Sequence, residues 1–194
     1  VLLPGTTRVY GSLYIYDGSP KENEMTYIDL ADNTLHRVPC SLPTAEQDYD
    51  YVIIDDRLHL LSDGHGTEAM TLHAVDPDNG QTLGDPVRFG ALNQLFPDHP
   101  DGTRATCSIE GRSLRHDPET GCLFAAALVY YPGDDDELTY VVKLDPATGQ
   151  ISCDPASRSF DSEVWNRGGQ WYCTEVARIQ QREEYDLYRT SVYA

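Results

Sequence analysis

The sequence predicts an all-β fold made of four similar units, each with about four antiparallel strands. Short runs of β-branched and aromatic residues alternate with polar residues, as expected for half-buried strands. This pattern of runs and turns recurs along the chain at an interval close to 45 residues. No long segment carries a convincing helical stripe of apolar residues, so the strands are not alternating with helices.

Four segments resemble one another, and they are 13–38, 58–83, 123–152 and 171–194. Met25, Met70 and Leu138 each precede a threonine and then an apolar or aromatic residue, and Tyr185 takes the equivalent place in the fourth segment. Met25 and Met70 are 45 residues apart, Met70 and Leu138 are 68 apart, and Leu138 and Tyr185 are 47 apart. The long interval indicates one period plus an insertion.

The repeat divides a single domain of residues 1–194 into four units of approximately 1–40, 48–90, 107–157 and 161–194, with an insert at 91–106. We expect a turn before the second strand of each unit, at VYGS (9–12), IDDR (54–57), PETG (118–121) and NRGG (166–169). Segment 176–188 is the best helix candidate, but its place in the repeat predicts a strand, a loop and a strand instead.

A closely matching turn follows the third strand in two units, as VDPDNGQ (75–81) and LDPATGQ (144–150). The second copy keeps a single carboxylate, which a calcium loop would not tolerate. What persists is Asp-Pro at the start and glycine at the end. That combination is typical of a type I turn followed by a glycine with positive φ. We therefore interpret both copies as hairpin turns, and HDPETG (116–121) as another.

Units of about 45 residues with four strands each are what a β-propeller requires. The Asp-Pro turns resemble those of quinoprotein-like and YVTN-type propeller repeats, a resemblance of pattern that covers nearly the whole chain and names no single family. It implies a β-propeller of about four blades, each of four antiparallel strands. The ring is either four-bladed or part of a larger propeller, and a β-sandwich is the alternative fold.

The net charge of −18 excludes two classes of partner. Nucleic-acid backbones and anionic membrane surfaces both attract basic patches, so neither is expected to bind this chain. The longest apolar run, 122–131, is too short to cross a bilayer as a helix, so no membrane insertion is expected. The charge favours cationic or polar partners.

The five cysteines leave two alternatives open. They can form two disulfides with one free thiol, or remain five buried thiols. Disulfides form in oxidising compartments, so the cysteine count favours an extracytoplasmic or secreted location. The cysteines are Cys40, Cys107, Cys122, Cys153 and Cys173.

The loops between second and third strands are the predicted binding face. They are 17–24, 62–68, 131–137 and 180–184. In a propeller, loops at equivalent places in each blade converge on one face. Together these loops carry a formal charge of −9, half of the net charge. The insert should lie on the same face, to which it adds Asp98, His99 and Asp101. The alternative is an ordinary solvated surface on an acidic protein.

The candidate ligand-binding residues are acidic, imidazole or aromatic side chains expected on this face: Asp63, His65, Asp98, His99, Asp134, Asp135, Asp136, Tyr131 and Trp165. A histidine beside a carboxylate can bind a divalent cation or exchange a proton. Tyrosine and tryptophan can stack on sugars, or fill the space between blades. No nucleophile elbow, dinucleotide-binding fingerprint or P-loop is present, and no catalytic residue is predicted.

These observations predict a non-enzymatic binding or interaction module that takes a cationic, peptide or polar ligand on its acidic face. The partner is an unknown protein or a small polar molecule. No cofactor is predicted, although a divalent cation is compatible with the candidates. A metal-assisted lyase or hydrolase at the channel mouth and a sugar-binding lectin are the alternatives.

Overall fold

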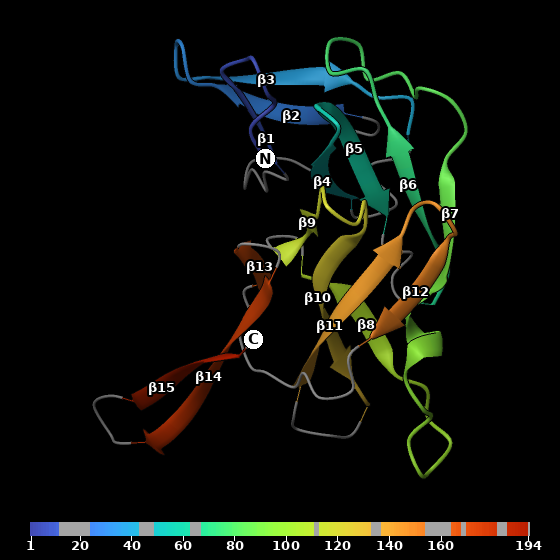
Figure 1. Cartoon of the computed structure of the whole chain (residues 1–194), viewed down its shortest axis with the longest axis vertical. Coiled ribbons are helices and arrows are strands. Elements are labelled where there is room, and N and C mark those ends of the chain that lie inside the picture. The colour runs from blue at the N-terminus through green and yellow to red at the C-terminus, as the bar shows by residue number, and fades with distance from the viewer. Residues whose placement is uncertain are drawn as a thin grey trace.

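The computed structural model describes residues 1–11, 24–42, 49–62, 67–110, 113–132, 137–153, 164–167, 170–181 and 186–193. Glu137 and the residues from 164 onward are described as backbone alone. The strands form four sheets in which every pairing is antiparallel (Figure 1). We refer to them as the first to the fourth sheet in chain order.

The first sheet has the order β1 (Arg8–Tyr10), β2 (Glu24–Asp29), β3 (Thr34–Pro39). Residues 1–3 extend it at the β1 edge, where Leu2 forms a bridge with Val9 and the Leu3 amide donates to the Arg8 carbonyl at 3.0 Å. The turn before β1 is therefore at residues 4–7. The turn predicted at VYGS is wrong for Val9 and Tyr10, which are strand residues that pair with Ile28 and Tyr27, and Ser12 lies outside the described residues.

The second sheet has the order β4 (Tyr49–Ile54), β5 (Arg57–Ser62), β6 (Ala69–Ala74), β7 (Val87–Ala91). Asp55 and Asp56 join β4 to β5 with φ values of 48° and 61°. Two successive residues with positive φ make the tight hairpin turn that suits the twist of antiparallel strands. The turn predicted at IDDR is confirmed.

The third sheet has the order β12 (Gln150–Cys153), β11 (Glu137–Asp145), β10 (Leu123–Tyr130), β8 (Thr106–Ile109), and β9 (Arg115–His116) also pairs with β10. A short 3-10 turn, η2 (Leu92–Leu95), lies between β7 and β8. The turn predicted at PETG joins β9 to β10 and is confirmed.

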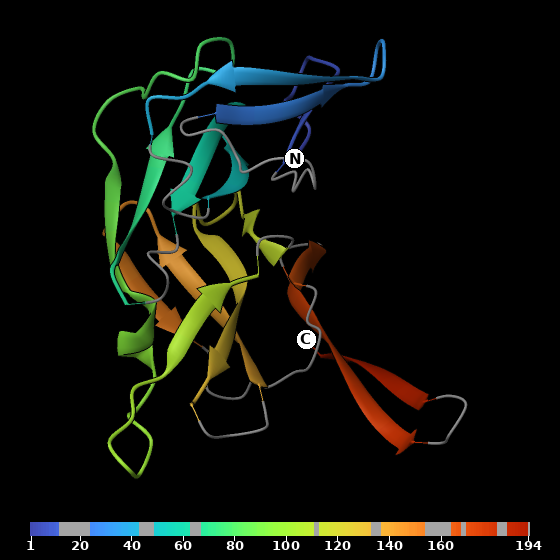
Figure 2. The ribbon, with the colours of Figure 1, turned by 180° about the vertical axis from the view of Figure 1, so that it is seen from behind.

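The fourth sheet has the order β13 (Val164–Arg167), β14 (Gln170–Gln181), β15 (Asp186–Tyr193). Segment 176–188 thus runs from one strand into the next, as its place in the repeat predicted. Figures 1 and 2 show the β14–β15 hairpin extending away from the other sheets, while β13 lies against β10.

Two apolar cores hold the first three sheets in a stack. One core lies between the first and second sheets and includes Tyr10, Met25, Leu58 and Leu60. The other lies between the second and third sheets and includes Leu61, Leu72, Phe89, Leu123 and Val142. Leu60 and Leu61 are adjacent in β5 and both are fully buried, so this strand is covered on both faces. In a two-layer β-sandwich each sheet is covered by another sheet on one face only, so the second sheet, covered on both faces, differs from that fold.

The Asp-Pro segments form the same turn in all three places. The glycine amide donates to the carbonyl of the first aspartate at 2.8 Å in 76–80, in 117–121 and in 145–149. Gly80, Gly121 and Gly149 have φ values of 67°, 70° and 71°. The aspartate side chains accept hydrogen bonds from their own turns, so these carboxylates have a local structural role.

A fourth copy of this turn, which the sequence pattern did not identify, joins β2 to β3. The Asn33 amide donates to the Asp29 carbonyl at 2.8 Å, and Asn33 has a φ of 59°. The segment DLADN (29–33) contains neither proline nor glycine. Asparagine replaces glycine because it tolerates the left-handed region better than other residues with a side chain.

Two of the turn glycines also dock one sheet on the preceding one. A Cβ on Gly80 would lie 2.0 Å from the Pro39 carbonyl oxygen, and one on Gly149 would lie 2.6 Å from the Arg88 carbonyl oxygen. Pro39 ends β3 and Arg88 is in β7, so each turn touches the last strand of the sheet before it. A Cβ on Gly121 would contact nothing within 4 Å.

Cys40, Cys107, Cys122 and Cys153 are all free thiols, and the first three are buried. Two intrachain disulfides would need four of the five cysteines, so that alternative is wrong for this structure. Burial raises the pKa of Cys107 to about 12 and also raises that of Cys40.

Candidate functional site

The insert is anchored to the core at both ends, and this fixes the position of the loop between. Leu92, in η2, is fully buried, and Phe96 packs its ring 4.8 Å from that of Tyr140. At the other end, Ala105 and Cys107 are buried beside β10. The exposed part of the insert, residues 97–104, therefore projects from a rigid base. We call it the insert loop; in Figure 1 it is the lowest loop, leading into β8.

The insert loop closes on itself through backbone hydrogen bonds. The His99 amide donates to the Thr103 carbonyl at 2.8 Å, and the Gly102 amide donates to the His99 carbonyl at 2.8 Å. Gly102 has a φ of 87°, which a residue with a side chain adopts only with strain. The Thr103 amide also donates to Asp101 Oδ1 at 2.8 Å. The insert loop is thus a small hairpin in which His99 and Asp101, two positions apart, lie close together.

His99 and Asp101 form a side-chain pair, with 3.0 Å between His99 Nδ1 and Asp101 Oδ1. The bonds from Thr103, and then the one from His99, lower the pKa of Asp101 to about 2. Asp101 is therefore ionised at neutral pH, and its carboxylate lies beside His99 Nδ1.

Tyr131 connects the insert loop to the third sheet. Its hydroxyl donates to the Pro97 carbonyl at 2.7 Å, and its ring lies 5.6 Å from the His99 imidazole, measured between centroids. Tyr131 directly follows β10 and directly precedes the acidic run at 132–137. Asp98 lies nearby in the chain and pairs with Arg104, at 3.5 Å between Oδ1 and Nε.

The structure thus brings together three of the nine predicted candidates: Asp98, His99 and Tyr131. They come from segments more than thirty positions apart, and they meet because the insert lies beside the β10–β11 connection. Asp101 joins them, as its place in the insert suggested. Arg104 was not anticipated, since the sequence pattern selected acidic, imidazole and aromatic side chains only.

The other candidates are not placed. Asp63, His65, Asp134, Asp135 and Asp136 lie outside the described residues. Trp165 is described as backbone alone, in β13, where it pairs with Tyr172. The convergence of the four acidic loops on one face stays a prediction.

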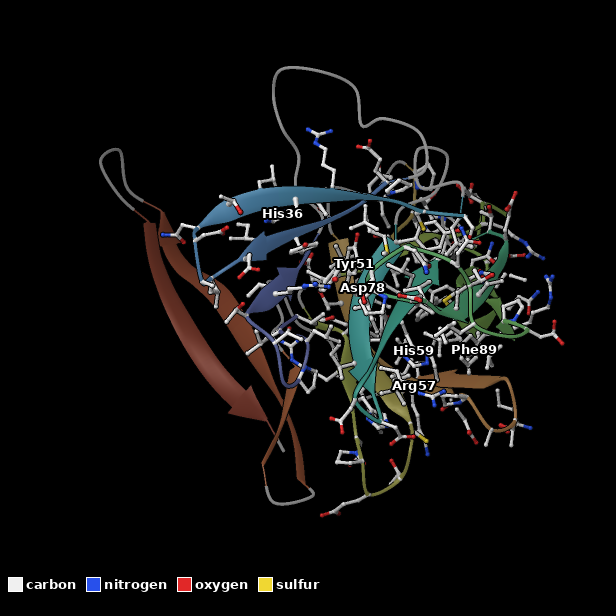
Figure 3. All side chains as sticks on the ribbon, turned by 90° about the horizontal axis from the view of Figure 1, so that it is seen from above. His36, Tyr51, Arg57, His59, Asp78 and Phe89 are labelled. Atoms are coloured by element: carbon white, nitrogen blue, oxygen red, sulfur yellow. The ribbon has the colours of Figure 1, made fainter. Side chains whose placement is uncertain are left out.

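A second group of ligand-type side chains, which the sequence did not single out, lies on the β2–β3 hairpin. The carboxylates of Asp29 and Asp32 and the imidazole of His36 each offer a ligand atom, and these atoms lie within 4.8 Å of one another. In Figure 1 this hairpin is at the opposite end of the molecule from the insert loop, and Figure 3 shows His36 on it.

The repeat explains why two carboxylates face each other on this hairpin. In the other three turns, the fourth residue is Asn79, Thr120 or Thr148, and its side chain donates to the carboxylate of the first. Asp32 takes that position in DLADN and, when ionised, has no proton to donate. Hydrogen bonds lower the pKa of both carboxylates, and one of those to Asp29 comes from the Ala31 amide within the turn. The main donors are the hydroxyls of Thr7 and Thr34.

This group fits a divalent cation only in part. The Thr34 hydroxyl lies 2.6 Å from Asp32 Oδ1 and 2.6 Å from His36 Nε2. An ionised Asp32 requires the hydroxyl to donate to it, so Nε2 of His36 must donate to the hydroxyl. That leaves Nδ1 as the nitrogen with a free lone pair. One half-buried carboxylate, one exposed carboxylate and one half-buried imidazole could hold a cation weakly, but the hydrogen bonds already satisfy them.

No protein-family profile and no curated protein matches the chain. Among solved structures, a mutant of Trypanosoma rangeli sialidase displaying trans-sialidase activity is similar, with a TM-score of 0.51 and 14% sequence identity. The match covers 96% of this chain and 35% of the sialidase chain. No helix among the described residues is long and apolar enough to span a membrane. At this identity the likeness concerns the fold alone, and it agrees with an all-β, propeller-like stack of antiparallel sheets.

Proposed function

We propose that this protein is a non-enzymatic binding module whose acidic surface, formed by the insert loop and the segment after β10, takes a cationic or polar ligand. The observation that carries this proposal is the contact of Tyr131 with Pro97 and His99. It joins the insert to a connection that continues into three consecutive aspartates, Asp134, Asp135 and Asp136. A rigid sheet that presents polar loops suits recognition.

The charge of this surface limits its ligand. On the insert loop, Asp98 is paired with Arg104 and Asp101 with His99. The adjoining segment 131–137 has a formal charge of −4. A basic peptide or a polyamine would gain from this charge, and an anion would be repelled. The finer prediction of about four blades, in a ring or in part of a larger propeller, is retained as part of this proposal.

The sialidase likeness does not change the preferred ligand class. Sialic acid carries a carboxylate, so a sialoside would approach an acidic surface against its electrostatic field. A metal-assisted lyase or hydrolase would need ligands at this surface. The best group of ligand atoms among the described residues instead lies at the opposite end, on the β2–β3 hairpin.

The test is titration of the intact protein with an arginine-rich peptide, followed calorimetrically at low and at physiological salt. We expect binding that weakens as salt rises, because the attraction is screened. The variant D134N/D135N/D136N should lose at least about tenfold in affinity, which corresponds to about 1.4 kcal/mol.

The matched control is D55N/D56N/D85N, which removes the same charge from exposed positions elsewhere. Asparagine is tolerated at the positive φ of Asp55 and Asp56. If both triple variants lose affinity equally, the attraction comes from net charge and the proposed surface is not a site. Hydrolysis of a sialoside by the wild-type chain would show that the protein is an enzyme and would end the proposal.

A further inference from the structure

Two half-buried histidines face each other where the second and third sheets meet. His59, in β5, pairs with Val52, and Val52 belongs to the apolar core that these two sheets share. His116, in β9, pairs with Leu123, which belongs to the same core. Directly paired residues in antiparallel strands project to the same face, so each imidazole points towards the other sheet. Both rings are half-buried, so they lie at the margin of the core.

The packing of β9 against β4 brings the two imidazoles close together. Val52, the pairing partner of His59, is in β4, and His116 is in β9. Figure 1 shows β9 beside β4, although the two strands belong to different sheets. Proton binding reflects this closeness, since burial lowers the pKa of His59 and the positive charges of His116 and Arg57 lower it further.

The structure fixes which nitrogen of His59 gains and loses a proton. His59 Nδ1 lies 3.0 Å from the Arg57 carbonyl oxygen. A carbonyl oxygen can only accept a hydrogen bond, so Nδ1 carries a hydrogen in both the neutral and the charged ring. The proton that the ring takes up on acidification therefore binds to Nε2. Titration changes the charge of the ring and leaves this hydrogen bond in place.

Within the second sheet, the charged side chains near His59 are Asp50, Asp55 and Arg57. Arg57 opposes a proton on His59 more strongly than Asp55 favours it. Asp50 shares the face of His59, because it pairs with Leu61 of the same core, and it lies at the end of β4 away from the turn. The described residues of β6 on this face are apolar.

On the third sheet, His116 is the titratable group that faces His59. The residues of β10 that point towards the second sheet are apolar, and they are Leu123, Ala125, Ala127 and Val129. Arg115 pairs with Phe124, so it points to the other face. The buried carboxylate of Asp117 accepts hydrogen bonds within its own turn, and that of Asp76 does the same. Two like charges at this mainly apolar margin are therefore weakly screened.

We propose that His59 and His116 form a proton-sensitive contact between the second and third sheets. The sheets pack closely while at least one of the two rings is neutral, and they loosen when both rings carry a proton. Because the folded chain lowers the pKa of His59, this contribution to stability is fully present above about pH 6.5, the ordinary value for histidine, and is lost as the pH falls below it. The core between the first and second sheets is separate and should stay packed over the same range.

The first test is an NMR titration of the imidazole groups in the intact chain. His116→Gln removes the facing charge and keeps a polar side chain, so the pKa of His59 should rise towards about 6.5. His73→Gln is the matched control, because His73 is half-buried in the same sheet, has a pKa lowered mainly by burial, and points towards the first sheet. It should leave His59 unchanged. A His59 that does not respond to His116→Gln, or that responds equally to both variants, would overturn the proposal.

The second test locates the loosening. Cys107 belongs to the core between the second and third sheets, and Cys40 belongs to the core between the first and second. Dithiodipyridine reacts with thiols even at acidic pH, so the labelling of both can be followed from pH 8 to pH 5 by non-reducing peptide mass spectrometry. We expect the ratio of Cys107 to Cys40 labelling to rise about tenfold, and either His59→Gln or His116→Gln to suppress the rise. A ratio that stays constant with pH, or that rises equally in these variants, would mean that acid does not act through the histidine pair.

Discussion

The turn glycines have two roles, which are to adopt a positive φ and to let the turn approach the preceding sheet closely, and single substitutions can distinguish them. Gly80, Gly121 and Gly149 share a positive φ, but only Gly80 and Gly149 approach the backbone of the preceding sheet. We predict that Gly121→Ala destabilises the protein by about 1–2 kcal/mol, the cost of a left-handed alanine. Gly80→Ala and Gly149→Ala should cost a further ~1–3 kcal/mol, because the added Cβ forces two sheets apart.

Urea denaturation of the three variants measures these differences, with Gly121→Ala as the internal control for backbone strain. Equal losses in all three would show that the turns do not hold the sheets together. A loss in Gly80→Ala accompanied by a smaller m-value would indicate that the first sheet separates before the rest of the molecule unfolds.

Tyr131 is predicted to order the insert loop through its hydroxyl. Tyr131→Phe removes the hydrogen bond to the Pro97 carbonyl and keeps the ring that packs beside His99. We expect a local loss of about 1 kcal/mol. Amide exchange should therefore accelerate at His99 and Thr103, whose backbones close the loop. Unchanged exchange there, with Tyr130→Phe as the comparison, would mean that the loop is ordered by its own hydrogen bonds alone.

Asp101 makes the insert loop sensitive to acid. Its pKa in the folded chain is about 2, below the ordinary value of about 3.9 for an unfolded aspartate. The ionised carboxylate therefore stabilises the fold above about pH 4, and this contribution is lost as the pH falls towards 2. An NMR titration should show the Thr103 amide shifting with a midpoint near pH 2. Asp101→Asn should abolish that transition, whereas Asp98→Asn should leave it in place.

At the scale of elements, the sequence predicts strands and turns where their chemistry is local. Asp-Pro followed by glycine identifies three turns, and the pair Asp55–Asp56 identifies a fourth. The β2–β3 turn escapes the same search because Asn33 replaces the glycine and Leu30 the proline. A turn was expected at VYGS from its place in the repeat, but the pairing of Val9 with Ile28 makes the start of this segment a strand.

Part of the candidate site could likewise be predicted from the sequence, and part of it could not. The insert was expected near the loop after β10 from the order of strands in a blade, and the contact between Tyr131 and Pro97 agrees with that expectation. The group of Asp29, Asp32 and His36 could not be found by spacing, because a hairpin turn brings the three together. Whether the acidic loops converge depends on how the sheets are arranged around an axis, which no local pattern contains.

The strands of the third sheet should protect its thiols from modification. Cys107 lies in β8, is 2% exposed, and its pKa is raised by burial to about 12. Cys122 is also buried, just before β10, whereas Cys153 at the end of β12 is half-buried. We predict that iodoacetamide at pH 8 labels Cys153 well before Cys107 or Cys122, as read by peptide mass spectrometry. Early labelling of Cys107 would mean that β8 opens readily from β10.

At the scale of the whole molecule, the balance of charge sets the response to salt. A net charge of −18 on 194 residues disfavours the compact state, because folding brings the carboxylates closer together. Raising ionic strength from about 0.01 to 0.1 M shortens the screening length from about 30 to 10 Å, which is comparable to the spacing of these charges. We therefore predict that the melting temperature rises over this range, in contrast to proteins held together by surface ion pairs.

Two variants locate the origin of this effect. If the repulsion is concentrated beside the insert loop, D134N/D135N/D136N should melt at a higher temperature than wild type at low salt and show a smaller salt dependence. D55N/D56N/D85N removes the same charge, so the difference between the two variants measures how strongly the acidic loop concentrates the field. A loop that concentrates charge at a cost to stability is expected where that charge attracts a ligand. Equal behaviour of the two variants would mean that the carboxylates act only as a diffuse solvated surface.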